Sequence, residues 1–300
     1  MKPARFEYAA PHTLHEAVSL LQQHEDEDVK ILAGGQSLVP LLNMRMARPE
    51  LLVDLNRIGE LQYIREEDGW LAIGAMTRKR AVEESELVRQ RQPVLFEATK
   101  LVGHPQIRNR GTVGGSMAHA DPAAEYPALA LVLGAEMRAV GPGGERRIAA
   151  EDFFQSYLMT ALEPVEVLTE VRVPVLEAET GWSFLEVARR HGDFALGGAT
   201  ALVRLDGGGS ISQARIVLFG LSAGSVRLEE VEGLLIGQRP GDALYEEAGA
   251  LASRGLEDPL SDTHASAEYR RHLAGVLTKR ALGEAVGRLG AGQPSEEGRG

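Results

Sequence analysis

The chain has 300 residues, of which 44% are hydrophobic and 25% are charged, and its formal net charge is -11 at pH 7. This length suits one large domain or two medium ones, and the composition is that of a globular protein rather than a fibre or a disordered chain. The acidic balance, without any dense basic run, argues against nucleic-acid binding. Because the sequence has no cysteine, it excludes disulfides and cysteine-ligated zinc or iron–sulfur clusters.

Targeting and membrane segments are not indicated. The N-terminal residues lack the apolar stretch of a signal peptide. The apolar runs fall far short of the roughly 20 residues that span a bilayer. We therefore expect a soluble, cytoplasmic protein with no membrane span.

The first third of the chain predicts a helix and several strands. Thr13 and Glu16 have the spacing of a capping box, and apolar residues then recur on one helical face. Residues 29–33 indicate a short buried strand that stops at a pair of glycines, and residues 51–55 indicate another strand. A Glu-Glu-Asp-Gly turn leads into a further strand at residues 70–75.

The middle of the chain predicts helices near Thr77 and Pro93, followed by a glycine-rich loop over residues 107–117. Asp121-Pro122 has the pattern of an N-cap followed by proline at the first helical position. Residues 136–148 form a hairpin around a Gly-Pro-Gly-Gly turn.

The last part of the chain begins with a strand over residues 165–173 and an acidic boundary near residue 176. Beyond this boundary we predict a meander of three strands and then two helices. These elements cover residues 183–189, 195–205, 214–220, 242–254 and 265–282. Strands and helices do not alternate strictly, which indicates an α+β fold rather than a doubly wound sheet.

Two glycine-rich segments are the candidates for chemistry. Each places paired glycines after a β-type run, and glycine leaves backbone N–H groups uncovered, so that consecutive ones form a nest for phosphate. Their residues are Ile31, Leu32, Ala33, Gly34, Gly35, Gln36, Ser37 and Leu38, and then Thr112, Val113, Gly114, Gly115 and Ser116. The simpler interpretation is two ordinary tight turns. The residues by themselves indicate a dinucleotide or phosphate ligand and no more.

Competing motifs are missing from the sequence. It contains neither G-x-G-x-x-G nor G-K-[ST], so a standard Rossmann site and a P-loop both lack their fingerprints. No H-x-x-x-H or H-E-x-x-H pattern occurs, and we expect no metal site. No acid–base dyad or nucleophilic triad is visible, so no catalytic residue is predicted.

Residues 33–58 (AGGQSLVPLLNMRMARPELLVDLNRI) resemble the first FAD motif of the carbon monoxide dehydrogenase/xanthine dehydrogenase flavoprotein family. Residues 107–136 (IRNRGTVGGSMAHADPAAEYPALALVLGAE) resemble its second FAD motif. The resemblance continues through residues 190–195 (RHGDFA) and ends at residues 266–271 (SAEYRR). It covers nearly the whole chain, and the paired motifs are specific.

The resemblance implies an FAD-binding domain of the p-cresol methylhydroxylase/vanillyl-alcohol oxidase type over residues 1–176, with two subdomains that divide near residue 57. A smaller α+β C-terminal domain would cover residues 180–287, and residues 290–300 would be a disordered tail. The family's cofactor is FAD, and both glycine-rich segments would hold its pyrophosphate.

The resemblance also assigns single residues. Glu125 stands where the family usually has aspartate, which lengthens the carboxylate by one methylene. Leu162 aligns with an apolar residue that contacts the flavin, whereas Leu185 replaces a flavin-contacting lysine. Asp193 and Phe194 match a motif near the isoalloxazine ring.

In this family a flavoprotein works beside a molybdopterin-binding large subunit and a small subunit with [2Fe–2S] clusters. The resemblance therefore implies an oxidoreductase subunit for electron transfer, within a dimer of heterotrimers. A stand-alone FAD-dependent oxidoreductase of the same fold is the main alternative, and a non-catalytic assembly subunit ranks third. The substrate and the final electron acceptor are not indicated by the sequence.

Overall fold

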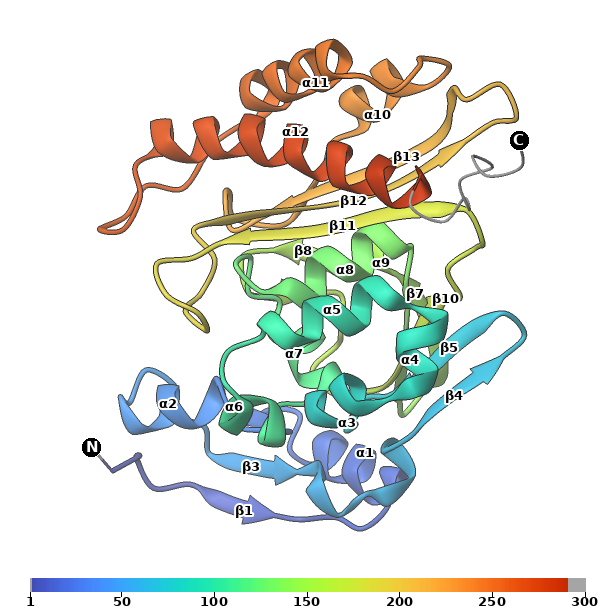
Figure 1. Cartoon of the computed structure of the whole chain (residues 1–300). Coiled ribbons are helices and arrows are strands. Elements are labelled where there is room, and N and C mark those ends of the chain that lie inside the picture. Colours follow the sequence, from blue (N-terminus) through green and yellow to red (C-terminus); the bar gives the residue numbers. More distant parts are fainter. Residues whose placement is uncertain (1, 291–300) are drawn as a thin grey trace. The chain divides into compact units, whose positions relative to one another are not determined.

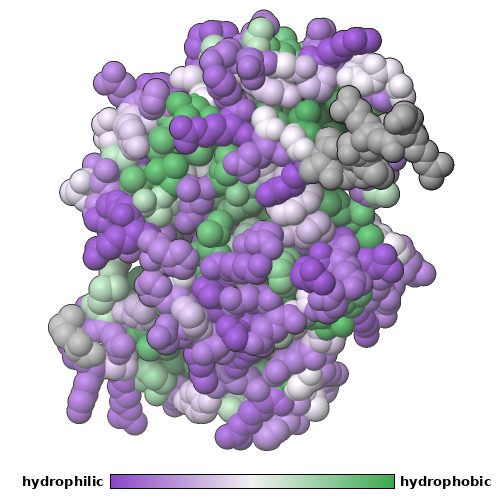
Figure 2. Space-filling view, viewed as in Figure 1, coloured by the Kyte–Doolittle hydropathy of each residue, from purple (hydrophilic) through white to green (hydrophobic). Residues whose placement is uncertain are grey.

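The computed structural model describes residues 2–290, and these form two compact units. The first unit contains the residues up to 121 together with residues 133–175. The second contains residues 122–132 and the chain from residue 176 onward. Figure 1 labels most helices and strands of both units. The face drawn in Figure 2 is largely hydrophilic, as expected for a chain with 25% charged residues.

The first unit begins with a small parallel sheet in the order β1-β3-β2. Its strands are β1 (Glu7–Ala9), β2 (Val29–Leu32) and β3 (Leu51–Asp54). β3 is buried, whereas β2 is an edge strand and is mostly half-buried. The predicted strand at residues 29–33 is thus confirmed, but its predicted burial is wrong.

Helix α1 (Leu14–Gln23) begins where the sequence predicts, because the hydroxyl of Thr13 accepts a hydrogen bond from the N–H of Glu16 at 3.2 Å. In return, the Glu16 carboxylate accepts from the N–H of His12 at 2.7 Å, one residue earlier than in a standard capping box. The apolar face of α1 packs on β3 in one hydrophobic cluster. Two short 3-10 turns, η1 (Leu55–Arg57) and η2 (Gly59–Leu61), lead out of β3.

The second sheet of this unit has five antiparallel strands in the order β4-β5-β10-β6-β7. Alternate residues on the central strands, such as Leu71, Ile73 and Val171, point into a buried apolar core. The strands are β4 (Ile64–Glu67), β5 (Trp70–Gly74), β6 (Glu136–Gly141), β7 (Gly144–Ala149) and β10 (Val167–Pro174). The predicted hairpin over residues 136–148 is confirmed by the pairing of β6 with β7. The predicted turn at residues 66–69 joins β5 to β4, a strand that was not predicted.

Short helices fill the rest of the first unit. They are α2 (Leu38–Asn43), α3 (Lys79–Glu84), α4 (Glu86–Arg91), α5 (Pro93–Leu101), α6 (Pro105–Arg110), α7 (Val113–His119) and α9 (Ala150–Phe153), followed by the hairpin of β8 (Phe154–Ser156) and β9 (Met159–Thr160). The loop predicted over residues 107–117 is wrong, since α6 and α7 occupy nearly all of it. The helix start predicted at Asp121-Pro122 is also wrong, because these residues lie in a turn and α8 (Glu125–Leu133) begins later.

The second unit contains a four-stranded antiparallel sheet in the order β11-β12-β13-β14, which confirms the predicted meander. Its elements are β11 (Thr180–Val187), β12 (Gly197–Leu205), β13 (Ile211–Phe219), β14 (Val226–Arg227), α10 (Glu229–Leu235), α11 (Asp242–Gly255) and α12 (Ala267–Gly290). Apolar residues of the strands and of these three helices form one core. Mixed strands and helices in both units confirm the predicted α+β class. The tail predicted beyond residue 290 lies outside the described residues.

Candidate cofactor site

The two glycine-rich segments, 80 residues apart in the sequence, meet in the first unit. A Cβ added to Gly34 would lie 2.4 Å from the carbonyl oxygen of Arg110 and 2.7 Å from the Cα of Gly111. A Cβ added to Gly115 would lie 3.4 Å from the Cβ of Ala33. The backbones approach so closely that only glycine fits at Gly34 without movement of one segment.

The first segment has the free backbone donors that a phosphate ligand needs. Gly35 takes φ +72°, a left-handed conformation that favours glycine. Within residues 2–290, no protein acceptor takes a hydrogen bond from the N–H groups of residues 34–38. The Gln36 side chain instead donates to the carbonyl oxygen of Gly34 at 3.1 Å, which fixes the loop. Five consecutive free N–H groups form a nest suited to an anion.

The second segment differs from the prediction, because its N–H groups already have acceptors in the protein. Thr112 is the N-cap of α7, and its buried hydroxyl is one of these acceptors. The hydrogen bonds run from Val113 N to Thr77 O (3.0 Å), from Gly114 N to Ala75 O (2.8 Å), from Gly115 N to Thr112 Oγ1 (3.1 Å) and from Ser116 N to Thr112 O (3.3 Å). An added Cβ on Gly114 would lie 2.5 Å from the Cβ of Ala75. This segment therefore holds α7 close to the sheet, and its Gly115 packs against Ala33 beside the nest.

A polar network that the sequence did not reveal ties the two segments together. The Asn56 amide donates to Ala33 O at 2.9 Å and accepts from Arg78 at 2.5 Å. Arg78 also donates to the carbonyl oxygen of Arg110. Partial burial of the Arg78 guanidinium, and then the nearby charge of Arg110, lower the pKa of Arg78. The Asp-x-Asn pattern after β3 is a sequence signal for the Asn56 end of this network, since Asp54 caps the following turn through Asn56 N at 2.9 Å.

The other predicted residues are distributed over both units. Leu162 lies in the first unit, two residues after β9, and β9 contacts α7. Glu125 begins α8 in the second unit and is buried. Asp193 and Phe194 follow β11 in the second unit. The Asp193 carboxylate lies 3.4 Å from Arg189, and the Phe194 ring is 68% exposed.

A second carboxylate faces Glu125 within the second unit. Glu186 lies on β11, next to Leu185, and its Oε2 atom is buried with no hydrogen-bond partner among the residues that the structure describes. Burial, and then the charge of Glu125, raise the pKa of Glu186 to about 8. No sequence pattern indicates this pairing, because Glu186 is a single polar residue within a predicted strand.

The amino-acid sequence matches two family models. Residues 4–176 match the family model described as the FAD binding domain in molybdopterin dehydrogenase, and residues 182–285 match the CO dehydrogenase flavoprotein C-terminal domain. The chain belongs to the FAD-binding medium subunits of carbon monoxide dehydrogenase/xanthine dehydrogenase-type molybdenum hydroxylases. This membership confirms the predicted fold type, cofactor and oxidoreductase class.

Similar proteins share nearly the full length of the chain. The alpha subunit of the 6-hydroxypseudooxynicotine dehydrogenase complex of Paenarthrobacter nicotinovorans is 43% identical, with 99% of each chain covered. The carbon monoxide dehydrogenase medium chain of Hydrogenophaga pseudoflava is 41% identical, with 96% of this chain and 99% of that one covered. The solved structure of carbon monoxide dehydrogenase from the latter organism has a TM-score of 0.93 at 42% identity, over 96% of this chain and 99% of that one. The structure of quinoline 2-oxidoreductase from Pseudomonas putida 86 has a TM-score of 0.91 at 38% identity, over 96% of this chain and 99% of that one.

No helix within the described part of this flavoprotein subunit is both long enough and apolar enough to cross a membrane.

Proposed function

We propose that the chain is the electron-transfer subunit of a heterotrimeric molybdenum hydroxylase. In this role it takes electrons from the [2Fe–2S] clusters of a small subunit and passes them to an external acceptor. The substrate is oxidised at the molybdopterin-binding large subunit. The observation that carries the proposal is the nest of free N–H groups at residues 34–38, in a chain whose relatives include medium chains of carbon monoxide dehydrogenase.

The residues of the first unit fit the pyrophosphate of FAD. Five backbone donors and the left-handed Gly35 suit a charged group that approaches the backbone closely. Gly34, Asn56 and Arg78 hold the nest against the second segment, so the donors are positioned before any ligand arrives. The bound flavin supplies the redox chemistry, and the protein supplies binding, orientation and electrostatics.

The chain's own residues also favour a role beside partner subunits. The sequence has no cysteine to hold an iron–sulfur cluster. A clustered set of three potential metal ligands does not occur in the part of the chain that the structure describes. The substrate-oxidising centre and the clusters therefore belong to other chains in this proposal. A dimer of heterotrimers suits a complex of this kind, since closed twofold assemblies are the commonest.

The deciding experiment compares the isolated chain with the reconstituted complex. Steady-state turnover of candidate substrates, such as carbon monoxide, purines, N-heteroaromatics and aldehydes, is measured with FAD-loaded chain alone and after addition of the two partner subunits. We expect turnover only with all three subunits. Efficient turnover by the isolated flavoprotein would reject the subunit role and support a stand-alone FAD-dependent oxidoreductase.

A further inference from the structure

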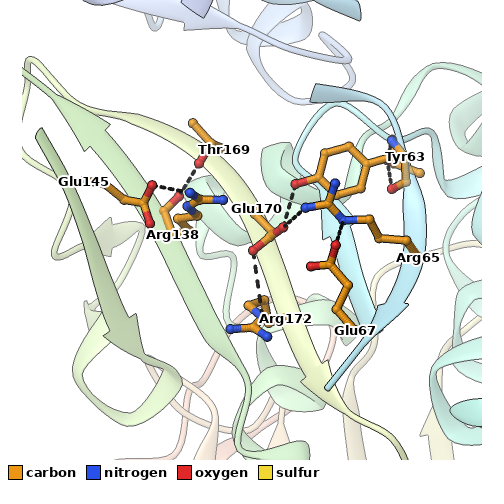
Figure 3. A network of polar contacts seen from close by, with 9 residues as sticks. Tyr63, Arg65, Glu67, Arg138, Glu145, Thr169, Glu170 and Arg172 are labelled. Carbon is orange, nitrogen blue, oxygen red and sulfur yellow. Dashed lines mark hydrogen bonds and ion pairs between the residues drawn. The ribbon is translucent and has the colours of Figure 1, made fainter. Parts of the chain in front are cut away.

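One face of the five-stranded sheet in the first unit carries four arginines from four different strands. Arg65 lies on β4, Arg172 on β10, Arg138 on β6 and Arg147 on β7. With Trp70 of β5, they line a recess of about 370 Å³. Figure 3 shows three of these arginines gathered around Glu170 on this face of the sheet.

A buried carboxylate lies at the centre of this arginine recess. Glu170 is 3% exposed and accepts a hydrogen bond from the Tyr63 hydroxyl at 2.6 Å. Its oxygens lie 3.7 Å from Arg65 Nη2 and 3.9 Å from Arg172 Nε. These two distances exceed the range of a hydrogen bond. Glu170 therefore draws the guanidinium groups together without using their N–H donors.

Some donors of the recess are already paired, since Arg65 Nε lies 2.7 Å from the Glu67 carboxylate and Arg138 Nη2 donates to Glu145, but two others are not. The Nε atoms of Arg138 and Arg172 are buried and have no hydrogen-bond partner among the described residues. Arg147 is exposed, and its nearest carboxylate, that of Glu136, is 3.9 Å away. A face built only from cross-strand ion pairs would satisfy such buried donors, because an unmade buried hydrogen bond is costly.

We propose that this recess binds a small organic anion through its carboxylate or phosphate groups. Guanidinium groups recognise both through paired hydrogen bonds. Four arginines and three carboxylates line the recess, and Glu145 and Glu136 lie beside Arg138 and Arg147. The proposal therefore rests on the arginine donors without a partner and not on a net positive charge. Its volume lies near the lower end of the roughly 300–1,000 Å³ of ligand pockets, which suits a small ligand.

The arginines of the recess differ in burial, and this gives them different roles. Arg172 is 9% exposed and its guanidinium lies over the Trp70 ring, 5.2 Å from the ring centre, which holds it in place. This buried arginine is the anchor for the anion. Arg147, at the rim, closes on the ligand from solvent. The site shares no residue with the proposed flavin nest, and it holds independently of the electron-transfer role.

Calorimetric titration of the FAD-saturated protein with citrate, pyrophosphate and inorganic phosphate, at constant ionic strength, tests the proposal. Saturation with FAD keeps the test anions out of the flavin nest. We expect saturable binding of at least one of them, with affinity weakened at least tenfold in Arg172→Gln and severalfold in Arg147→Gln. Arg254→Gln, which changes an exposed arginine on α11 of the second unit, is the matched control and should bind as wild type does.

Arg147→Gln keeps the test decisive if Arg172→Gln does not fold, because Arg147 is exposed and its replacement leaves the buried network intact. The proposal is overturned if none of the three anions gives a stronger binding signal than a control titration with sodium chloride. Equal affinity in wild type and in the folded recess variants would overturn it too, since the anion would then bind elsewhere.

Discussion

Gly34 shows how one missing side chain determines the geometry of the candidate site. The atoms nearest to its absent Cβ belong to the backbone of Arg110 and Gly111 and cannot turn aside as a side chain would. The sequence indicates this glycine as part of a phosphate nest, and the structure adds a second reason for it. Its freedom serves the contact between two protein segments, whereas the neighbouring Gly35 provides the left-handed backbone.

We expect Gly34→Ala to push the two segments apart, weaken FAD binding at least tenfold and lower the free energy of unfolding by about 1–3 kcal/mol, as overpacked sites do. FAD binding is measured by quenching of flavin fluorescence, and stability by chemical denaturation. Gly143→Ala is the control, because a Cβ there meets nothing within 4 Å. Unchanged FAD affinity in Gly34→Ala would show that close contact of the segments is not needed for the cofactor.

Glu186 provides a prediction about pH. Its pKa of about 8 in the folded protein lies above the ordinary glutamate value of 4.5, so the folded state binds more protons than the unfolded state between these pH values. The free energy of unfolding therefore falls as pH rises from about 4.5 to 8. Since the side chain is only partly buried, we discount the effect for solvent screening to about 1–2 kcal/mol.

Glu186→Gln should remove this contribution, so that the variant is more stable than wild type at pH 8.5 by about 1–2 kcal/mol and nearly equal to it at pH 5. Urea denaturation at the two pH values measures the difference. Glu257→Gln, at an exposed position of the same unit, is the control. A constant difference between Glu186→Gln and wild type at both pH values would contradict the buried, protonated state of Glu186.

At the scale of elements, α7 is the clearest case of a helix that its local sequence does not predict. Glycines at residues 111, 114 and 115 lower helix propensity, which favours a loop. The helix forms because Thr112 caps it and because Gly114 lets it approach Ala75. By contrast, α1, the hairpin of β6 and β7 and the C-terminal meander were predictable, since their apolar periodicity or turn residues are local signals. Only the Asn56 end of the Asn56–Arg78 network has a local signal, the Asp-x-Asn pattern, because the contacts of Arg78 with Asn56 and Arg110 are tertiary.

The cap of α7 can be tested by itself. Thr112→Ala removes the hydroxyl that accepts from Gly115 N and should lower the free energy of unfolding by about 1–2 kcal/mol. Thr112→Ser keeps that hydroxyl, so it should lose much less. Chemical denaturation of FAD-free protein measures both changes. Equal losses in the two variants would mean that the methyl group of the buried Thr112, and not its hydrogen bond, is responsible.

At the scale of the whole molecule, the predicted residues are distributed over two units. The nest lies in the first unit, while Glu125, Asp193 and Phe194 belong to the second. The first unit should therefore recognise the phosphate part of the cofactor. FAD, ADP and riboflavin contain different portions of this ligand, so each reports on a different part of the site.

FAD at 100 times its dissociation constant should stabilise the folded protein by about 2.7 kcal/mol, which corresponds to a rise in Tm of about 5–10 °C. ADP retains the pyrophosphate and should give part of this rise, because the free N–H groups of residues 34–38 interact with phosphate oxygens. Riboflavin, at the same concentration, lacks phosphate and should give little. Thermal unfolding of wild type and of Gly34→Ala with each ligand measures these effects. A larger rise with riboflavin than with ADP would contradict the nest as the main anchor, because binding would then depend on the flavin ring and not on phosphate.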